Sequence, residues 1–261
     1  MAGHRPPIIA LLTDFGTTDW YVAAMKGVIL GICPDARLVD ITHQIPPQDI
    51  TSGAFTLAAA VPYFPAGTIF ACVVDPGVGS DRPLVAARAD AQFLVGPDNG
   101  LLSLVLRRAR RRAIVRITNR RYWRREISST FHGRDIMGPV AAHLACGTPL
   151  ARVGPPVTRY QALDLPPVRR TVRGVTGEVV SIDAFGNVIT NVPASSLRGS
   201  ARPRVEYKRR PVRVVSSYAA GKTGELVAVR GSIGYIELAI RNGSAAKQFH
   251  AKRGDSVGVL H

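Results

Sequence analysis

The sequence predicts two domains of different class: an α/β N-terminal domain with a central, mostly parallel sheet, and an all-β, barrel-like C-terminal domain. In the first part of the chain, apolar runs of strand length alternate with stretches of helical periodicity, the pattern of a parallel sheet covered by helices. Beyond the proline-rich residues 163–167, short β-rich runs are separated by turn residues, as in a small barrel. We place the boundary at about residue 166, which gives domains 1–166 and 167–261.

The first domain is predicted to begin with a buried strand at residues 8–12, which ends in a turn at Asp14. Thr17 or Thr18 is suited to cap the helix that follows. The prolines at 46 and 47 precede a predicted helix at about residues 48–61, consistent with proline's tolerance at a helix start. Other strands are expected at 37–41, 68–74, 84–88, 93–95 and 114–117, and other helices at 22–32, 101–109 and 136–146.

The second domain consists almost entirely of predicted strands. They are expected at residues 177–182, 188–192, 204–207, 212–215, 226–229, 235–240 and 256–260. Their short length and regular spacing are typical of a barrel or sandwich.

The stretch at residues 73–82 (VVDPGVGSDR) contains the densest group of informative residues. Asp75 follows the apolar run 68–74, and Pro76, Gly77 and Gly79 end that strand and let the backbone turn closely. Ligands of open α/β sheets bind beside such strand ends. An ordinary turn with a solvated aspartate is the alternative interpretation of this stretch taken alone.

The chain is strongly basic: 34 lysines and arginines against 18 acidic residues give a formal net charge of +16. A polyanion such as nucleic acid is therefore a possible partner. The arginine-dense segment 107–125, with Tyr122 and Trp123, suits phosphate contacts and base stacking. We favour a solvated helix end and loop for this segment, because charge runs usually face water.

The three cysteines, Cys33, Cys72 and Cys146, show no Cys-x-x-Cys spacing, which argues against a disulfide framework and against a zinc site. A reducing cytosol fits this usage best. No apolar run approaches membrane-spanning length, so we expect a cytoplasmic protein with no membrane association. Walker, Rossmann, His-Glu-x-x-His and Gly-x-Ser-x-Gly motifs do not occur.

Four motifs, taken together and in this order, resemble the S-adenosylmethionine hydroxide adenosyltransferase family, whose relatives include fluorinase and chlorinase. The motifs are residues 13–16 (TDFG), 74–79 (VDPGVG), 131–135 (FHGRD) and 182–191 (IDAFGNVITN). Residues 231–237 (GSIGYIE) extend the resemblance toward the C-terminus. It implies the two-domain fold described above and hydrolysis of S-adenosyl-L-methionine to adenosine and L-methionine. It also implies homotrimers whose ligand lies between the N-domain of one subunit and the C-domain of the next.

The resemblance implies a role for individual residues. Asp75, Arg82 and His132 match the catalytic Asp-Arg-His set that positions and activates a water. Asp14 matches the residue that holds the ribose diol, a role suited to the two acceptor oxygens of a carboxylate. The positions that hold the methionine portion or the adenine are matched by Asp183, Phe185, Asn187 and Ser232. The order of polar residues after Glu237 departs somewhat from the family pattern.

The chemistry of such a reaction makes few demands on the protein. Methionine leaves a sulfonium as a neutral molecule, so no acid, metal or added cofactor is required. Water is a poor nucleophile and needs a nearby base or an environment that favours hydroxide. Asp75 and His132 are both candidates for the base, and Arg82 would favour an anionic oxygen.

Two further activities are compatible with the same fold. Halogenating relatives carry Tyr in place of Asp75 and Tyr-Ser in place of His132 and Gly133, whereas this chain has the hydroxide version at each place. The other possibility is a sensor that binds S-adenosylmethionine with negligible turnover.

His143 lies in an apolar helical stretch and is expected to be structural.

Overall fold

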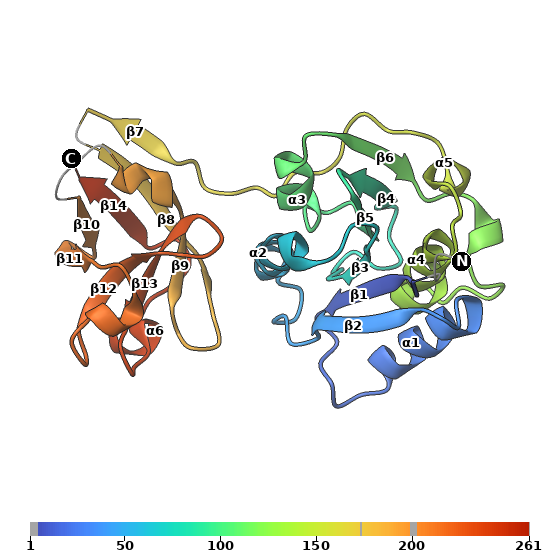
Figure 1. The fold of residues 1–261 in the computed structure, drawn as a ribbon, viewed down its shortest axis with the longest axis horizontal. Helices are drawn as coiled ribbons and strands as arrows, with labels where there is room; N and C mark the ends of the chain where they lie inside the picture. Colours follow the sequence, from blue (N-terminus) through green and yellow to red (C-terminus); the bar gives the residue numbers. More distant parts are fainter. Residues whose placement is uncertain (1–4, 173, 199–202, 261) are drawn as a thin grey trace. The chain divides into compact units, whose positions relative to one another are not determined.

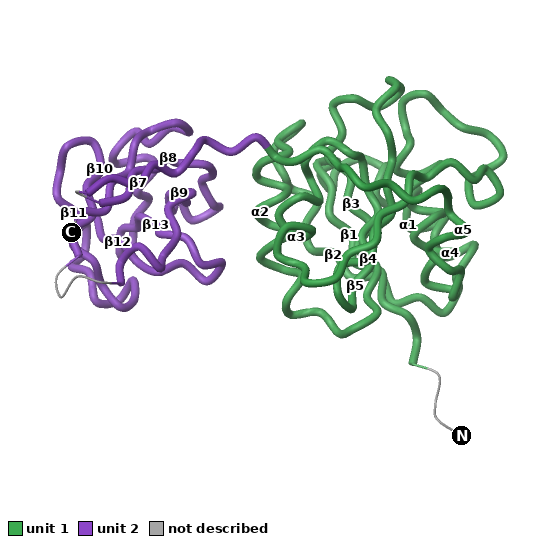
Figure 2. The backbone as a smooth tube through the Cα atoms, turned by 90° about the horizontal axis from the view of Figure 1, so that it is seen from above, with its two compact units in different colours: residues 1–163 green, residues 164–261 purple. Residues whose placement is uncertain are grey.

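The computed structural model describes residues 5–172, 174–198 and 203–260. It divides into two compact units, residues 1–163 and 164–261, which Figure 2 shows in different colours. The predicted fold class is confirmed in both units: the first is α/β with a mostly parallel sheet, and the second is a closed β-barrel.

The sheet of the first unit has six strands in the order β2-β1-β3-β5-β4-β6 (Figure 1). The pairs β1–β2, β1–β3 and β3–β5 are parallel, whereas β4 runs antiparallel to both β5 and β6. The strands are β1 (Ile8–Thr13), β2 (Arg37–Thr42), β3 (Ile69–Val73), β4 (Leu84–Ala89), β5 (Gln92–Pro97) and β6 (Arg112–Arg116). Because β1 and β3 are parallel neighbours, with Thr13 opposite Val73, their carboxyl ends lie side by side.

Helices cover both faces of this sheet (Figure 1). On one face α1 packs against α4, and their apolar residues Met25, Ile29 and Val140 meet Ile9 and Leu11 of β1 in a single core. On the other face α2 packs against α3. The helices are α1 (Tyr21–Ile32), α2 (Ile50–Ala60), α3 (Ser103–Arg108), α4 (Gly138–Ala145) and α5 (Leu150–Val153). Short 3₁₀ turns occur at Val61–Tyr63 and Arg120–Tyr122.

Two helix starts differ from the prediction. Helix α1 begins at Tyr21, with Trp20 at the capping position and no side-chain cap. The expected cap by Thr17 or Thr18 is therefore wrong. Thr17 instead accepts a hydrogen bond from the Gln44 amide at 3.1 Å. The helix expected at 136–146 begins earlier, with a π-helical turn at Gly133–Met137 that immediately follows His132.

The second unit contains a barrel of seven strands with an eighth strand attached. The order β14-β10-β11-β12-β13-β9-β8 closes because β14 also pairs with β8, and β7 extends the sheet beyond β8. The strands are β7 (Arg169–Thr171), β8 (Gly174–Ile182), β9 (Val188–Pro193), β10 (Arg204–Tyr207), β11 (Arg210–Val214), β12 (Leu226–Arg230), β13 (Tyr235–Ile240) and β14 (Ser256–Leu260). Helix α6 (Ala245–Gln248) and 3₁₀ turns at Ala194–Leu197 and Tyr218–Ala220 complete the unit.

Alternate residues of the barrel strands point inward and form one apolar core. Val205, Tyr207, Val257 and Val259 belong to it and are each no more than 1% exposed. In the part of the chain that the structure describes, no helix has the length and apolar character needed to cross a bilayer.

Candidate active site

The first unit joins three of the predicted site residues in one hydrogen-bonded group. Arg82 Nε donates to Asp75 Oδ1 at 2.5 Å, and Arg82 Nη2 donates to Asp75 Oδ2. The same Nη2 lies 3.3 Å from His132 Nδ1. The Asp75 and Arg82 side chains are only 4% and 11% exposed, so water screens this ion pair weakly. The fold therefore brings together residues separated by 50 positions in the sequence.

Glycine makes this arrangement possible at two points. Gly79 has φ of +80°, and a Cβ there would lie 2.5 Å from the Ser129 carbonyl oxygen, so the loop that carries Asp75 and Arg82 closely approaches the loop before His132. At Gly133 a Cβ would lie 3.3 Å from the Phe15 ring. A small residue after His132 therefore lets the π-helical turn pack against the loop that follows β1.

Asp14 lies at the carboxyl end of β1, beside the loop that carries Asp75. Its amide donates to the Val73 carbonyl at 3.3 Å, and its Oδ2 accepts the Gln48 amide at 2.8 Å. Burial raises the pKa of Asp14 above its ordinary value, and the nearby Asp75 charge adds to this, although the Gln48 hydrogen bond acts in the opposite direction.

The protonation state of His132 follows from its partner. A guanidinium has only donors, so His132 Nδ1 must accept, and the ring is then neutral with its proton on Nε2. Burial lowers the pKa of His132, and the Arg82 charge lowers it further, whereas Asp75 and Asp135 act against this. Both arguments give a neutral imidazole that donates through Nε2.

These pKa shifts predict the acid limb of catalysis. Protonated His132 would direct an N–H at Arg82, and protonated Asp14 would lose acceptor capacity, so either protonation should lower kcat/KM. Because the pKa of His132 is lowered from 6.5, we expect its protonation to reduce kcat/KM only below that pH. Because the pKa of Asp14 is raised from 3.8, we expect its protonation to begin to matter above that pH. Measuring kcat/KM from about pH 4 to about pH 8 tests this, and an acid limb at or above pH 6.5 would contradict it.

In the second unit, the connection between β8 and β9 contains Asp183, Phe185 and Asn187. Asp183 Oδ1 accepts the amides of Phe185 and Asn187 at 2.9 and 2.8 Å, and its Oδ2 accepts Asn187 Nδ2 at 2.9 Å. This network fixes the turn and presents the Phe185 ring, which is 80% exposed. Gly186, at φ +81°, lets the turn lie against Ser244. The Ala246 amide donates to the Gly186 carbonyl at 2.9 Å.

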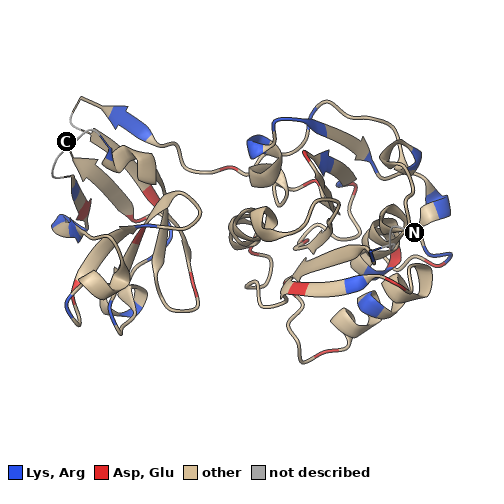
Figure 3. Ribbon diagram, in the orientation of Figure 1, with Lys and Arg blue, Asp and Glu red and all other residues tan. Residues whose placement is uncertain are grey.

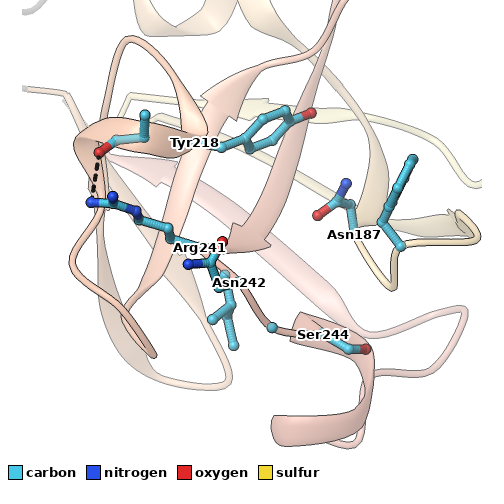
Figure 4. Close-up of a pocket in the computed structure, with 9 residues that line it drawn as sticks. Asn187, Tyr218, Arg241, Asn242 and Ser244 are labelled. Carbon is cyan, nitrogen blue, oxygen red and sulfur yellow. Dashed lines mark hydrogen bonds between the residues drawn. The ribbon is translucent and has the colours of Figure 1, made fainter.

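A cavity of about 700 Å³ lies beside this turn (Figure 4). Two of the candidate residues, Phe185 and Asn187, line it, whereas Asp183 does not and instead accepts a hydrogen bond from Asn187 within the turn. The remaining lining residues were missed by the sequence analysis: Tyr218, Ala219, Ile240, Arg241, Asn242, Gly243 and Ser244. The only signal for the last five was their position in the tract after Glu237.

Tyr218 is held by a buried carboxylate. Its hydroxyl donates to Glu237 Oε2 at 2.7 Å, and burial raises the pKa of Glu237, with the Asp183 charge adding to the effect. Ser232 is exposed on the turn between β12 and β13 and does not line the cavity. The structure therefore does not join Ser232 to the other predicted residues of this unit.

The arginine-rich segment forms β6 and the loop after it, where lysines and arginines gather in Figure 3. Several of its arginines have partners within the fold. Arg124 donates to the buried carboxylate of Asp135 at 2.7 Å, and Arg120 lies over the Trp123 ring. Part of this charge therefore stabilises the loop that leads to His132.

Comparison with known proteins assigns the chain to a class. The SAM hydroxide adenosyltransferase N-terminal domain matches residues 9–154, and the C-terminal domain of the same family matches residues 177–258. The chain belongs to the SAM hydroxide adenosyltransferase family, which confirms the resemblance inferred from its motifs.

Individual relatives cover almost the whole chain. A protein of Salinispora tropica named (R)-S-adenosyl-L-methionine hydrolase is 43% identical over 97% of both chains, and one of the same name from Thermus thermophilus is 39% identical over 97% of this chain and 99% of its own. A fluorinase from an Actinoplanes species is 29% identical over 99% of both. The crystal structure of a conserved Thermotoga maritima protein superposes with a TM-score of 0.89 at 36% identity, covering 97% of this chain and all of that one.

Proposed function

We propose that this protein hydrolyses S-adenosyl-L-methionine to adenosine and L-methionine. The observation that carries the proposal is the partly buried contact of Asp75, Arg82 and His132, a set of groups suited to activating a water. Family membership and the hydrolase names of the relatives support it. Fluorinase is a more distant relative, and its halide chemistry is the alternative within the same family.

The protonation states favour different roles for the two candidate bases. His132 Nδ1 faces Arg82, so the ring has Nε2–H to donate and no free lone pair on a nitrogen. Each Asp75 oxygen accepts one hydrogen bond from Arg82 and keeps a second lone pair. We therefore assign Asp75 as the proton acceptor, with Arg82 holding its carboxylate and His132 Nε2–H orienting the water oxygen.

The proposed reaction is a single displacement at the ribose C5′. The water oxygen forms a bond to C5′ as its proton passes to Asp75, and the C5′–S bond breaks with its electron pair remaining on sulfur. The positive sulfonium becomes the neutral thioether of methionine, so the leaving group needs no proton. Catalysis then depends on alignment of the water and on its partial desolvation.

The other residues would hold the substrate. Asp14 suits the ribose diol, because a carboxylate offers two acceptor oxygens to two hydroxyls. The cavity of the second unit, with Phe185 and Asn187, suits the adenine or methionine portion, and Asp183 fixes its turn. Ser232 is a proposed contact that would require its exposed turn to meet the ligand. No cofactor takes part in this scheme.

The proposed assembly is a homotrimer in the cytoplasm. Asp14, Asp75 and His132 belong to the first unit, and the 700 Å³ cavity belongs to the second. One ligand held by both sets of residues would bury more surface than either set alone offers. In this scheme the first unit of one chain and the second unit of its neighbour complete each site.

The proposal is tested by incubating the purified protein with S-adenosyl-L-methionine and separating the products by chromatography. We expect adenosine and methionine in equal amounts, and no halogenated nucleoside when chloride is added. The variant Arg82→Lys tests the role of the Asp75–Arg82 contact. It keeps a positive charge but loses the two-point contact with Asp75, so it should form adenosine much more slowly than the wild type. Binding of the substrate without adenosine formation would instead indicate a sensor, and the proposal would fail.

A further inference from the structure

The segment that connects β2 to α2 contacts the Asp14 turn at four points. Gln48 N donates to Asp14 Oδ2 at 2.8 Å, Gly16 N donates to the His43 carbonyl at 2.7 Å, and Gln44 Nε2 donates to Thr17 Oγ1 at 3.1 Å. The fourth contact joins the His43 ring to Thr13, with Nδ1 2.8 Å from Oγ1. His43 thus holds the turn on both sides of Asp14, through its side chain and its backbone.

His43 is almost fully enclosed. It is 5% exposed and Thr13 is 1% exposed, so their contact is shielded from water. The other ring nitrogen, Nε2, lies 3.0 Å from Asp40 Oδ1, close enough for attraction although the N–H is not aimed straight at the oxygen. Asp40 in turn accepts Lys26 Nζ at 2.6 Å. Enclosed polar groups such as His43 and Thr13 hold a unique geometry when they are paired.

The donors and acceptors fit one consistent direction. The Thr13 hydroxyl oxygen accepts the Phe15 amide at 3.2 Å, so its own hydrogen is free to point at His43 Nδ1. Nδ1 then accepts, and the ring proton is on Nε2, the nitrogen that lies 3.0 Å from Asp40 Oδ1. The chain of contacts runs from Lys26 on α1 to the Phe15 amide, the residue next to Asp14.

The backbone of the same segment is strained where it meets the carboxylate. Gln48 has φ of +64°, a conformation that residues other than glycine rarely adopt. In this conformation the Gln48 backbone amide points at Asp14 and donates a hydrogen bond to its carboxylate. Strained backbone persists where the surrounding structure determines it, and it often occurs at functional sites.

We propose that His43 is a positioning residue for Asp14: through Thr13 and Gly16 it fixes the turn that presents the carboxylate to the ribose. The proposal rests on the proposed function, because Asp14 is assigned there to the ribose diol. His43 does not touch the substrate. Its contribution is the angle and position of Asp14, so it should affect ligand affinity more than the chemical step.

Two substitutions separate the two ring nitrogens. His43→Gln extends toward Asp40 but withdraws the acceptor from Thr13, whereas His43→Asn places its amide oxygen near the Nδ1 position. We expect His43→Gln to raise the Kd for adenosine, measured by calorimetry, by about tenfold and to raise KM by about the same factor. The value of kcat should change less than about twofold. His43→Asn should restore most of this loss. His143→Gln, on α4, is the control for replacing a histidine elsewhere.

A double-mutant cycle distinguishes positioning from a general structural role. If His43 acts through Asp14, adding His43→Gln to Asp14→Ala should weaken adenosine binding no further than Asp14→Ala alone. Equal losses in both backgrounds would overturn the inference. Thr13→Val, compared with Thr13→Ser, tests the same contact if His43→Gln does not fold.

The failure of this inference is distinguishable from failure of the proposed function. Wild-type protein that forms adenosine, combined with additive losses in the cycle, would overturn the role of His43 alone. Wild-type protein that neither forms nor binds adenosine would overturn both proposals.

Discussion

Asp75→Asn should lower kcat for S-adenosylmethionine hydrolysis by about a thousandfold, because the amide cannot accept the proton of the attacking water. Adenosine affinity should change only a few-fold, since Asp75 acts on the water and contacts the substrate little. Steady-state kinetics and calorimetry with adenosine measure the two effects separately. Asp81→Asn is the matched control, because this exposed aspartate lies in the same loop and has no assigned role.

The reverse division of effects would contradict the assignment of Asp75. If Asp75→Asn abolished adenosine binding while the remaining complex turned over at the normal rate, Asp75 would be a ligand contact. The ion pair between Asp75 and Arg82 would then serve to orient the Asp75 carboxylate toward the ligand.

Mixed assemblies should regain activity from two inactive variants. Asp75→Ala lacks the water-activating carboxylate of the first unit, and Asp183→Ala lacks the carboxylate that fixes the turn of the second. In the proposed trimer, random mixing of equal amounts leaves about a quarter of the sites with both parts intact, so about a quarter of wild-type activity should return. The measurement is the hydrolysis rate after joint dissociation and reassociation.

Mass spectrometry of the mixture provides the control for this experiment. Mixed trimers that remain inactive would show that each site is built within one chain. A chain that stays monomeric yet active would overturn the proposed assembly itself.

The sequence predicted the fold well because the local signals agree with it. The run at residues 69–73 is apolar throughout and forms β3, buried along its whole length, and the Asp-Pro-Gly that follows ends the strand as expected. The barrel strands were similarly marked by turn residues between short apolar runs. The alternation of strands and helices implied a parallel sheet. The pairing of β1 with β3, which places Asp14 beside the Asp75 loop, is seen only in the structure.

Other features depend on contacts between distant segments and could not be predicted. The pairing of Arg82 with His132 Nδ1 is set by how the π-helical turn packs against the loop after β3, and it fixes the tautomer that the residue types alone left open. Helix α1 lacks the expected threonine cap because it begins at Tyr21, so Trp20 occupies the capping position. Thr17 is instead bound by Gln44 from another loop. Tyr218 enters the cavity through a 3₁₀ turn and its contact with Glu237, neither of which leaves a clear sequence pattern.

The central claim is that a water oxygen replaces methionine at C5′, and isotope labelling tests it most directly. The protein is incubated with S-adenosyl-L-methionine in water enriched in oxygen-18, and the adenosine formed is analysed by mass spectrometry. The account predicts one heavy oxygen in each adenosine, located at the 5′ position, at the enrichment of the solvent. Adenosine without the label at that oxygen would contradict it.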